Sequence, residues 1–261
     1  MKLMLLSFAC LMLVMVAMSG ITGAAETSPQ IYEVRSYVLG QEGDVEALDH
    51  YLRDALLPAL GRLEITPVGV FSDAANDENP GERIVVVIPY SNANQVVSVR
   101  QALQHDPQYA EDAKEYFDRE PSNPPYQRIQ SELLAAMDCM PTLNVPAGTL
   151  SNEDRVYELR LYESPNERMG DLKVEMFNSG EVPIFLASGI QPIFIGQCVV
   201  GSQTPSLTYL TVYPSETERL KAWKAFRIHP DWKVLSKVPR YRGTVSHIDK
   251  FILVPKPYSQ M

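Results

Sequence analysis

Hydrophobic and polar residues follow the same succession of strand-like and helix-like patterns twice along the chain. Strand-like alternation opens each half, and a stretch with apolar residues every three or four positions follows it, as at Leu48, Leu52 and Leu56. Two further strands, a second helix and a last strand complete each half. The expected strands lie near residues 31–37, 66–71, 84–89 and 127–136 in the first half and 156–162, 191–200, 208–213 and 243–254 in the second.

Polar and proline residues mark where the expected helices start and bend. Ser164 and Ser215 are each followed three residues later by glutamate, which is the pattern of a capping box. Pro58 and Pro183 fall late in the first helix of each half. Because proline lacks an amide donor, we expect both helices to kink or end there.

The two halves also share residues at a nearly constant offset, which indicates an internal duplication. The pattern Tyr-Glu-x-Arg-x-Tyr occurs at 32–37 and again at 157–162. Residues 140–154 contain two prolines and a glycine and are typical of a linker. The sequence therefore predicts a first repeat over 26–139 and a second repeat over 155–261.

The order β-α-β-β-α-β in each repeat is that of the ferredoxin-like split βαβ unit. Such a unit places its helices on one face of an antiparallel sheet and leaves the other face uncovered. Two copies in one chain can cover those faces by packing sheet against sheet. The expected fold class is therefore α+β, with tandem ferredoxin-like repeats and two antiparallel sheets packed face to face.

The N-terminus has the pattern of a secretory signal peptide. Lys2 precedes the apolar run 3–18, and the small residues Gly23 and Ala25 fit cleavage after residue 25. An uncleaved membrane anchor is the alternative, but the run is shorter than the ~20 residues that a spanning helix needs. We expect residues 1–25 to be removed and the protein to be secreted or periplasmic.

The net charge of the chain disfavours two classes of binding partner, nucleic acids and anionic membranes. The 261 residues include 23 Lys and Arg against 32 Asp and Glu, a formal net charge of −9, and 45% are hydrophobic. This hydrophobic content is ordinary for a globular protein, and the acidity disfavours a nucleic-acid partner. Docking on an anionic membrane is also disfavoured, because an acidic chain is repelled and no basic amphipathic helix is evident.

The sequence does not decide whether two of its cysteines form a disulfide, and it shows no metal-binding pattern. Signal cleavage would remove Cys10 and leave Cys139 and Cys198. These two could pair in an oxidising compartment, and their spacing does not decide the matter. No spacing of cysteine and histidine suggests zinc, so no metal site is predicted.

The order and spacing of several motifs resemble the NIPSNAP family. The second half carries them best, at 156–162, in the helix 220–226 and in His-Pro-Asp-Trp at 229–232, whereas 105–109 is divergent. The resemblance covers most of 30–255. It implies the architecture of the dimeric α/β-barrel superfamily, here formed within one chain. Eukaryotic members are linked to vesicles and mitochondria as interaction proteins, and the family supplies no generally established catalytic residues to transfer.

Strand alternation sorts the side chains into two faces. Leu159 suits the helix-covered face, so Glu158 and Arg160 are expected to point into a cavity between the sheets. A small apolar ligand with an anionic or carbonyl end would suit such a cavity. Structural Glu–Arg ion pairs are the alternative reading. The candidate cavity residues are Glu33, Arg35, Tyr37, Glu158, Arg160, Tyr162, Tyr209, Thr211, Tyr213, His247 and Asp249.

The histidines offer weaker hypotheses. His247 with Asp249 could act as a carboxylate-oriented general base, although no motif places a serine or cysteine nucleophile nearby. His105 and His229 follow equivalent helices, where a histidine bonds to the last carbonyl groups and complements the helix dipole. A haem ligand is the alternative for these two, because some dimeric α/β-barrel enzymes bind haem.

Two functions remain open at this point. The first is a non-catalytic module that binds a small ligand or a protein partner. The alternative is a cofactor-independent or haem-dependent enzyme, oxygenase-like, that acts on a small hydrophobic substrate in the barrel cavity. No cofactor is predicted by the residues themselves, and oligomers could form by pairing of exposed strand edges.

Overall fold

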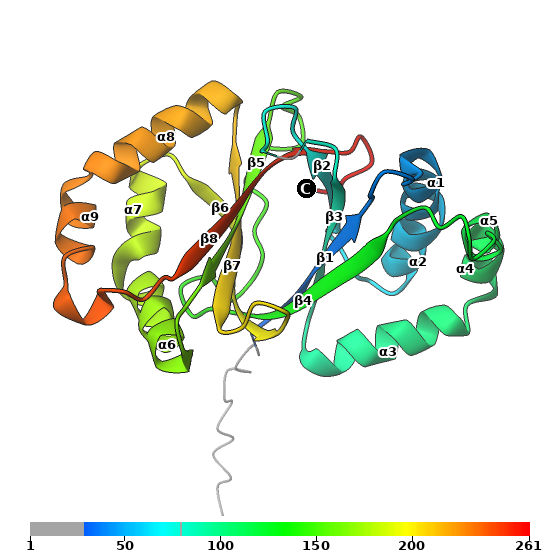
Figure 1. Cartoon of the computed structure of the whole chain (residues 1–261), viewed down its shortest axis with the longest axis horizontal. Coiled ribbons are helices and arrows are strands. Elements are labelled where there is room, and N and C mark those ends of the chain that lie inside the picture. Colours follow the sequence, from blue (N-terminus) through cyan, green and yellow to red (C-terminus); the bar gives the residue numbers. More distant parts are fainter. Residues whose placement is uncertain (1–28, 79) are drawn as a thin grey trace, which may run out of the picture.

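Strands from both halves of the chain form one closed antiparallel barrel, in which each half contributes four neighbouring strands. The computed structural model describes residues 29–78 and 80–261, and within them eight strands form this barrel between two layers of helices (Figure 1). The expected signal segment 1–25 lies outside the described residues. The predicted α+β class and antiparallel sheet are confirmed.

Each half contributes four strands in the same spatial order. The N-terminal half places them as β4-β1-β3-β2 and the C-terminal half as β8-β5-β7-β6. The strands are β1 (Ile31–Val38), β2 (Gly69–Asp73), β3 (Arg83–Tyr90), β4 (Arg128–Ala136), β5 (Val156–Glu163), β6 (Gln191–Val200), β7 (Ser206–Tyr213) and β8 (His247–Pro255).

The two groups of four strands meet along their edges as well as across the barrel. β2 pairs with β8 and β4 pairs with β6, both antiparallel. The expected pair of separate, face-to-face sheets is therefore one continuous sheet that closes on itself, and each of the two junctions pairs only three or four residues of a strand. The stretch between β4 and β5, which includes the expected linker 140–154, contains neither helix nor strand.

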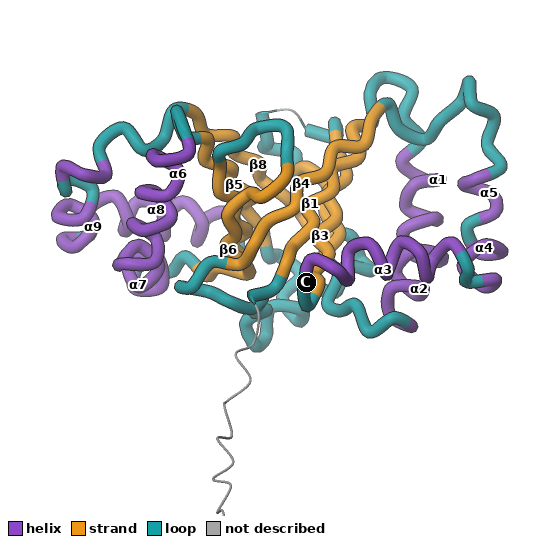
Figure 2. Tube along the Cα trace, turned by 90° about the horizontal axis from the view of Figure 1, so that it is seen from below, coloured by secondary structure: helices purple, strands orange, loops and turns teal. Residues whose placement is uncertain are grey.

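The helices form two layers on opposite sides of the barrel, one from each half (Figure 2). One layer contains α1 (Val45–His50), α2 (Leu57–Arg62), α3 (Ala93–Gln104), α4 (Pro107–Asp112) and α5 (Lys114–Phe117). The other contains α6 (Glu167–Met176), α7 (Val182–Ala187), α8 (Glu216–Ile228), α9 (Pro230–Leu235) and a 3-10 turn, Pro239–Tyr241. Among the described residues, no helix combines the length and the apolar composition that a bilayer crossing requires.

The first helix of each half contains a π-helical segment directly before its proline, as expected of a kink. Tyr51–Leu56 precedes α2 and Phe177–Glu181 precedes α7. Pro58 and Pro183 cannot donate the usual helical hydrogen bond, and the widened turn accommodates this. Ser215 caps α8 as predicted, but Asn166, not Ser164, caps α6 through its side chain.

Three apolar clusters sort the strand residues differently from the prediction. The barrel interior is filled by side chains of both halves, among them Tyr32, Tyr157, Leu159 and Leu210. The helix-covered faces bury the alternate residues, such as Tyr162. The face assignment from sequence is therefore wrong, because both faces of these strands are buried and the apolar set does not mark the helix side.

Candidate functional site

The carboxylate of Glu33 on β1 faces the helices of the N-terminal half and is bound only by strand residues. Within the described chain, it accepts hydrogen bonds from Arg35 Nε at 2.8 Å, from Ser131 Oγ at 2.8 Å and from Tyr90 OH at 3.1 Å. Burial alone would raise the pKa of Glu33, but the Arg35 charge and these bonds hold it below its usual value. The group is therefore an ionised partner for Arg35.

Arg35 lines a cavity of about 840 Å³ between strands β1, β3 and β4 and the helices of this half. Its Nη1 lies 3.4 Å from Tyr37 OH, and its side chain remains 23% exposed. Arg100 and Lys114 also line the cavity and make no ion pair within the described part of the chain. Three cations thus face a space that also holds the carboxylates of Glu33 and Asp118.

The rest of the cavity wall is mainly apolar and aromatic, with Gln104 and Ser131 as further polar side chains. Val96, Val99 and Leu103 of α3 contribute to it, together with Tyr51 and Tyr109. The two tyrosine hydroxyls lie 2.8 Å apart, so each satisfies the other in a buried position. A volume of this size, with a mainly apolar surface and polar groups gathered at part of its wall, is typical of a site for a small organic molecule.

A second cavity of about 390 Å³ adjoins the first on the other side of Arg35. Both cavities are lined by Arg35, Tyr51, Phe117 and Ile129. The guanidinium group therefore stands where the two spaces meet, within reach of a ligand in either.

The equivalent face of the C-terminal half is closed by its own helix. Glu158 on β5 is fully buried and accepts hydrogen bonds from Arg160 Nη1 at 2.9 Å, from Arg219 Nη1 at 2.6 Å and from Trp223 Nε1 at 2.6 Å. Arg219 and Trp223 both belong to α8. The Arg160 guanidinium lies 4.5 Å from the centre of the Trp223 ring, so α8 covers this arginine.

The remaining strand candidates of this half join the same closed network. Tyr209 OH donates to Tyr162 OH at 2.8 Å, and the Thr211 hydroxyl lies 3.1 Å from both the Glu158 carbonyl oxygen and the Tyr213 hydroxyl. Burial raises the pKa of Tyr162 to about 12. These hydroxyls are thus neutral hydrogen-bonding groups beneath the helices and not part of the barrel interior.

His247 and Asp249 do not join the other candidates. His247 Nε2 lies 2.9 Å from Asp249 Oδ1, and Asp249 Oδ2 accepts from Gln203 at 2.7 Å. Both lie on the same face of β8 as Leu253, which is the face toward the barrel interior and opposite that of Glu158. The single cavity expected from sequence is therefore replaced by two separate helix-covered clusters and an exposed His–Asp pair.

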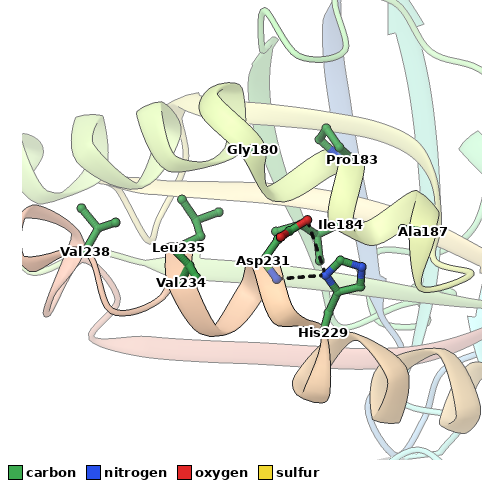
Figure 3. Close-up of a pocket in the computed structure, with 9 residues that line it drawn as sticks. All are labelled: Gly180, Pro183, Ile184, Ala187, His229, Asp231, Val234, Leu235 and Val238. Atoms are coloured by element: carbon green, nitrogen blue, oxygen red, sulfur yellow. Dashed lines mark hydrogen bonds and ion pairs between the residues drawn. The ribbon is translucent and has the colours of Figure 1, made fainter.

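The two helix-end histidines behave differently from each other. His105 Nδ1 lies 2.8 Å from the Gln101 carbonyl oxygen, as expected for a helix C-terminus. His229 instead begins α9, where its Nδ1 accepts from the Asp231 amide at 3.3 Å. It lies in a groove of about 390 Å³ between α7 and α9, with Ile184 and Val234 on the walls (Figure 3).

Donor groups in the large cavity do not fit a haem. Its lining contains no histidine, cysteine or methionine in the described residues. Burial raises the pKa of Tyr51, Tyr90 and Tyr109, which disfavours a phenolate ligand. Cys139 and Cys198 are free thiols. No group of three metal-ligating side chains occurs in 29–78 and 80–261.

Sequence reasoning missed Tyr51, Tyr109, Ser131 and Arg219. Ser131 belongs to an expected strand, but its contact with Glu33 depends on the pairing of β4 with β1. The other three lie on helices, and only the rotation of each helix against the sheet reveals what they contact. Trp223, close to Arg219 on α8, was the one available signal.

Comparisons with known proteins agree with this architecture. The NIPSNAP family model matches residues 157–260. Two proposed monooxygenases, from Lactobacillus acidophilus and Fusobacterium nucleatum, share the fold with TM-scores of 0.57 at 13% and 9% identity. Each alignment covers 87% of this chain, and 94% and 93% of the respective relatives. A NIPSNAP-like protein from Burkholderia xenovorans aligns over 41% of this chain and 90% of its own, with 17% identity and a TM-score of 0.37. No curated protein is significantly similar in sequence.

Proposed function

Because residues 157–260 form a NIPSNAP domain within a barrel that both halves complete, we propose that this protein binds a small molecule in the cavity beside Arg35. The molecule has a largely apolar body and an anionic end. Binding, not catalysis, is the proposed role.

The main support for this proposal is that the two equivalent buried glutamates differ in their hydrogen-bond partners. Every hydrogen-bond partner of Glu33 in the described residues comes from a strand, whereas α8 supplies Arg219 and Trp223 to Glu158. Without such side chains, the N-terminal half keeps a large space in front of Arg35. A protein stabilised only by packing has no need of this space, since cavities reduce stability.

Charge defines the end of the ligand that Arg35 would receive. Arg35, Arg100 and Lys114 outnumber Glu33 and Asp118 on the cavity wall. A guanidinium group pairs well with a carboxylate, sulfonate or phosphate. Valine, leucine and tyrosine side chains on the remaining wall favour an aliphatic or aromatic body.

Two further proposals accompany this one. The common strand order supports descent of both halves from one ferredoxin-like βαββαβ unit. The pattern of residues 1–25 supports export, which would deliver the binding protein outside the cytoplasm.

An oxygenase-like enzyme that uses the same cavity is the second candidate. The whole-chain fold shared with the two proposed monooxygenases favours it. In that case Arg35 would hold the anionic end of the substrate, Glu33 would accept a proton from it, and dioxygen would be the oxidant that turnover consumes.

Native mass spectrometry of residues 26–261, purified from the native host, tests the proposal. We expect a retained small molecule that is absent from the V99W variant, because tryptophan at this lining position fills the cavity. An unchanged adduct in V99W would contradict the proposed site. If the wild-type protein instead loses its adduct on incubation and releases an oxidised product, the enzyme is favoured.

A further inference from the structure

Charge is segregated between the two halves of the chain. Residues 26–139 contain 20 acidic and eight basic residues, a net charge of −12, whereas residues 155–261 contain ten acidic and 14 basic residues, a net charge of +4. The overall charge of −9 conceals this division. Because the halves place their helices on opposite sides of the barrel, the charges occupy opposite ends of the molecule (Figures 1 and 2).

The positive end is formed by α8 and α9. Lys224, Arg227, Lys233 and Lys237 are exposed and make no ion pair within the described residues. Beside them, Val234 is 71% exposed and forms part of the groove between α7 and α9 (Figure 3). This end therefore joins unpaired cations to apolar surface.

Leu220 and Ile228 extend that apolar surface along α8. They are 54% and 60% exposed, Lys224 stands four residues from each of them, and Arg227 stands seven residues from Leu220. Residues at such spacings share one helix face. The combination of exposed aliphatic groups and unpaired cations is typical of an interaction surface and not of a solvated one.

The negative end is formed by α4, α5 and the residues that follow. Glu111, Glu115 and Glu120 are exposed there and likewise have no ion pair in the described part of the chain. Phe117 lies among them and is 56% exposed. Lys114 is also exposed here without an ion pair in the described residues, so the three glutamates leave this end with an excess of unpaired negative charge around an exposed apolar group.

We propose that copies of this protein associate head to tail, with the α8–α9 face of one copy against the α4–α5 face of the next. Unlike charges attract and orient the two faces, and the exposed apolar side chains lose contact with water on docking. The two faces differ, so the contact is heterologous and a bound copy leaves one face of each sign available for another. This inference does not require a ligand in the cavity, although Phe117 lies both on the α4–α5 face and in the cavity lining.

A second copy is favoured over another partner because one chain carries both complementary faces, each without internal ion pairs at the residues named. The ~8 Å Debye length at physiological ionic strength limits such attraction to short range. Association should therefore be weak at that ionic strength and stronger when salt is removed.

Sedimentation velocity of residues 26–261 at about 20 mM and about 500 mM salt tests the association, since the Debye length falls from roughly 20 to roughly 4 Å. We expect dimers and longer species at low salt, and an association constant roughly tenfold or more smaller at high salt. A monomer under both conditions, up to about 100 μM protein, would overturn the inference, because complementary faces must associate under the least screened condition.

Charge-reversal variants identify the two faces. K224E/R227E/K233E makes both ends acidic, and E111K/E115K/E120K makes both ends basic. Each should be monomeric alone at low salt, and an equimolar mixture should associate again. Circular dichroism checks that these exposed substitutions leave the fold intact. A mixture that stays monomeric would contradict the proposed pairing.

Vesicles containing phosphatidylglycerol distinguish a lipid partner. If the wild type stays monomeric but binds these vesicles, and K224E/R227E/K233E does not, the positive end serves a membrane surface and the head-to-tail proposal is wrong. If association persists in both triple variants alone, other surfaces form the contact and the proposal also fails.

Discussion

The two helix-covered faces of the barrel have the same strand pattern, but one borders an open cavity and the other is closed by a helix. Glu33 and Arg35 line a cavity of about 840 Å³. Glu158 and Arg160 instead lie beneath α8 and contact its side chains Arg219 and Trp223. The strands are alike, so the helices decide the outcome. α3 presents valine and leucine to the sheet where α8 presents arginine and tryptophan.

This difference separates stability from binding within one fold. A buried glutamate satisfied by three donors, two of them from a helix, fastens that helix to the sheet. A glutamate whose hydrogen bonds all come from strand residues does not hold a helix against the sheet. The sequence of that helix can then change, and the space beneath it stays open. The half with the NIPSNAP match is the closed half, and the divergent half carries the candidate site.

The largest expected effect breaks the closed face. Glu158→Gln should lower the free energy of unfolding by about 3–5 kcal/mol, because Arg160 and Arg219 lose the charge that compensates them in a buried place. Glu33→Gln should cost only about 1–3 kcal/mol, since water in the cavity can reach Arg35. Urea unfolding measures both, and equal losses would contradict the distinction between the faces.

A smaller effect follows from exchanging the helix side chains. Trp223→Val removes a buried ring and the donor to Glu158, and should lower the free energy of unfolding by about 3 kcal/mol. Val99→Trp should change it by about 1 kcal/mol or less, because the ring enters existing space. Thermal unfolding of both variants tests this pair. A large loss in V99W would mean that no space is available at this position.

Ligand binding should distinguish the two arginines. Anilinonaphthalene sulfonate has an apolar body and an anionic end, so it serves as a probe. Arg35→Gln should weaken its binding about tenfold, equivalent to the loss of a charge-assisted hydrogen bond of about 1.4 kcal/mol. Arg160→Gln is the matched control and should leave the affinity unchanged. Fluorescence titration measures both, and equal weakening would show that the probe does not read the cavity.

The smallest effect is a pH dependence of the open face. The pKa of Glu33 is lower in the folded chain than its usual value of 4.5. The stability that this carboxylate contributes is therefore present above pH 4.5 and is lost as the pH falls through the lowered value. The difference in unfolding free energy between wild type and Glu33→Gln should shrink in acid. A difference that stays constant from pH 6 to about pH 3 would contradict the Glu33–Arg35 pairing.

The strands and their order could be predicted because alternation and duplication are local properties of the sequence. The side to which each strand face points could not. In a closed barrel with helices outside, both faces are buried, and all residues of β7 are buried. Leu159 and Glu158 then give no indication of which one faces the helices. The prediction followed the rule that helices cover apolar strand faces. Here α8 covers a polar face instead, because its Trp223 and Arg219 side chains donate hydrogen bonds to the buried Glu158 carboxylate.

Most of the candidate residues do lie in clusters, but beneath the helices and not in the space between sheets that was expected. Glu33, Arg35 and Tyr37 do lie together, and so do Glu158 and Arg160. The cavity itself depends on side chains of α3 to α5, whose rotation against the sheet is a tertiary property. Periodicity alone does not fix it.

A crystal structure of residues 26–261 with anilinonaphthalene sulfonate is the most direct test of the central claim. We predict the sulfonate within hydrogen-bond distance of the Arg35 guanidinium, with the rings between the sheet and helices α3 to α5. Density inside the barrel, beside Arg160, or in the groove between α7 and α9 would contradict the assignment of the ligand site to the open face.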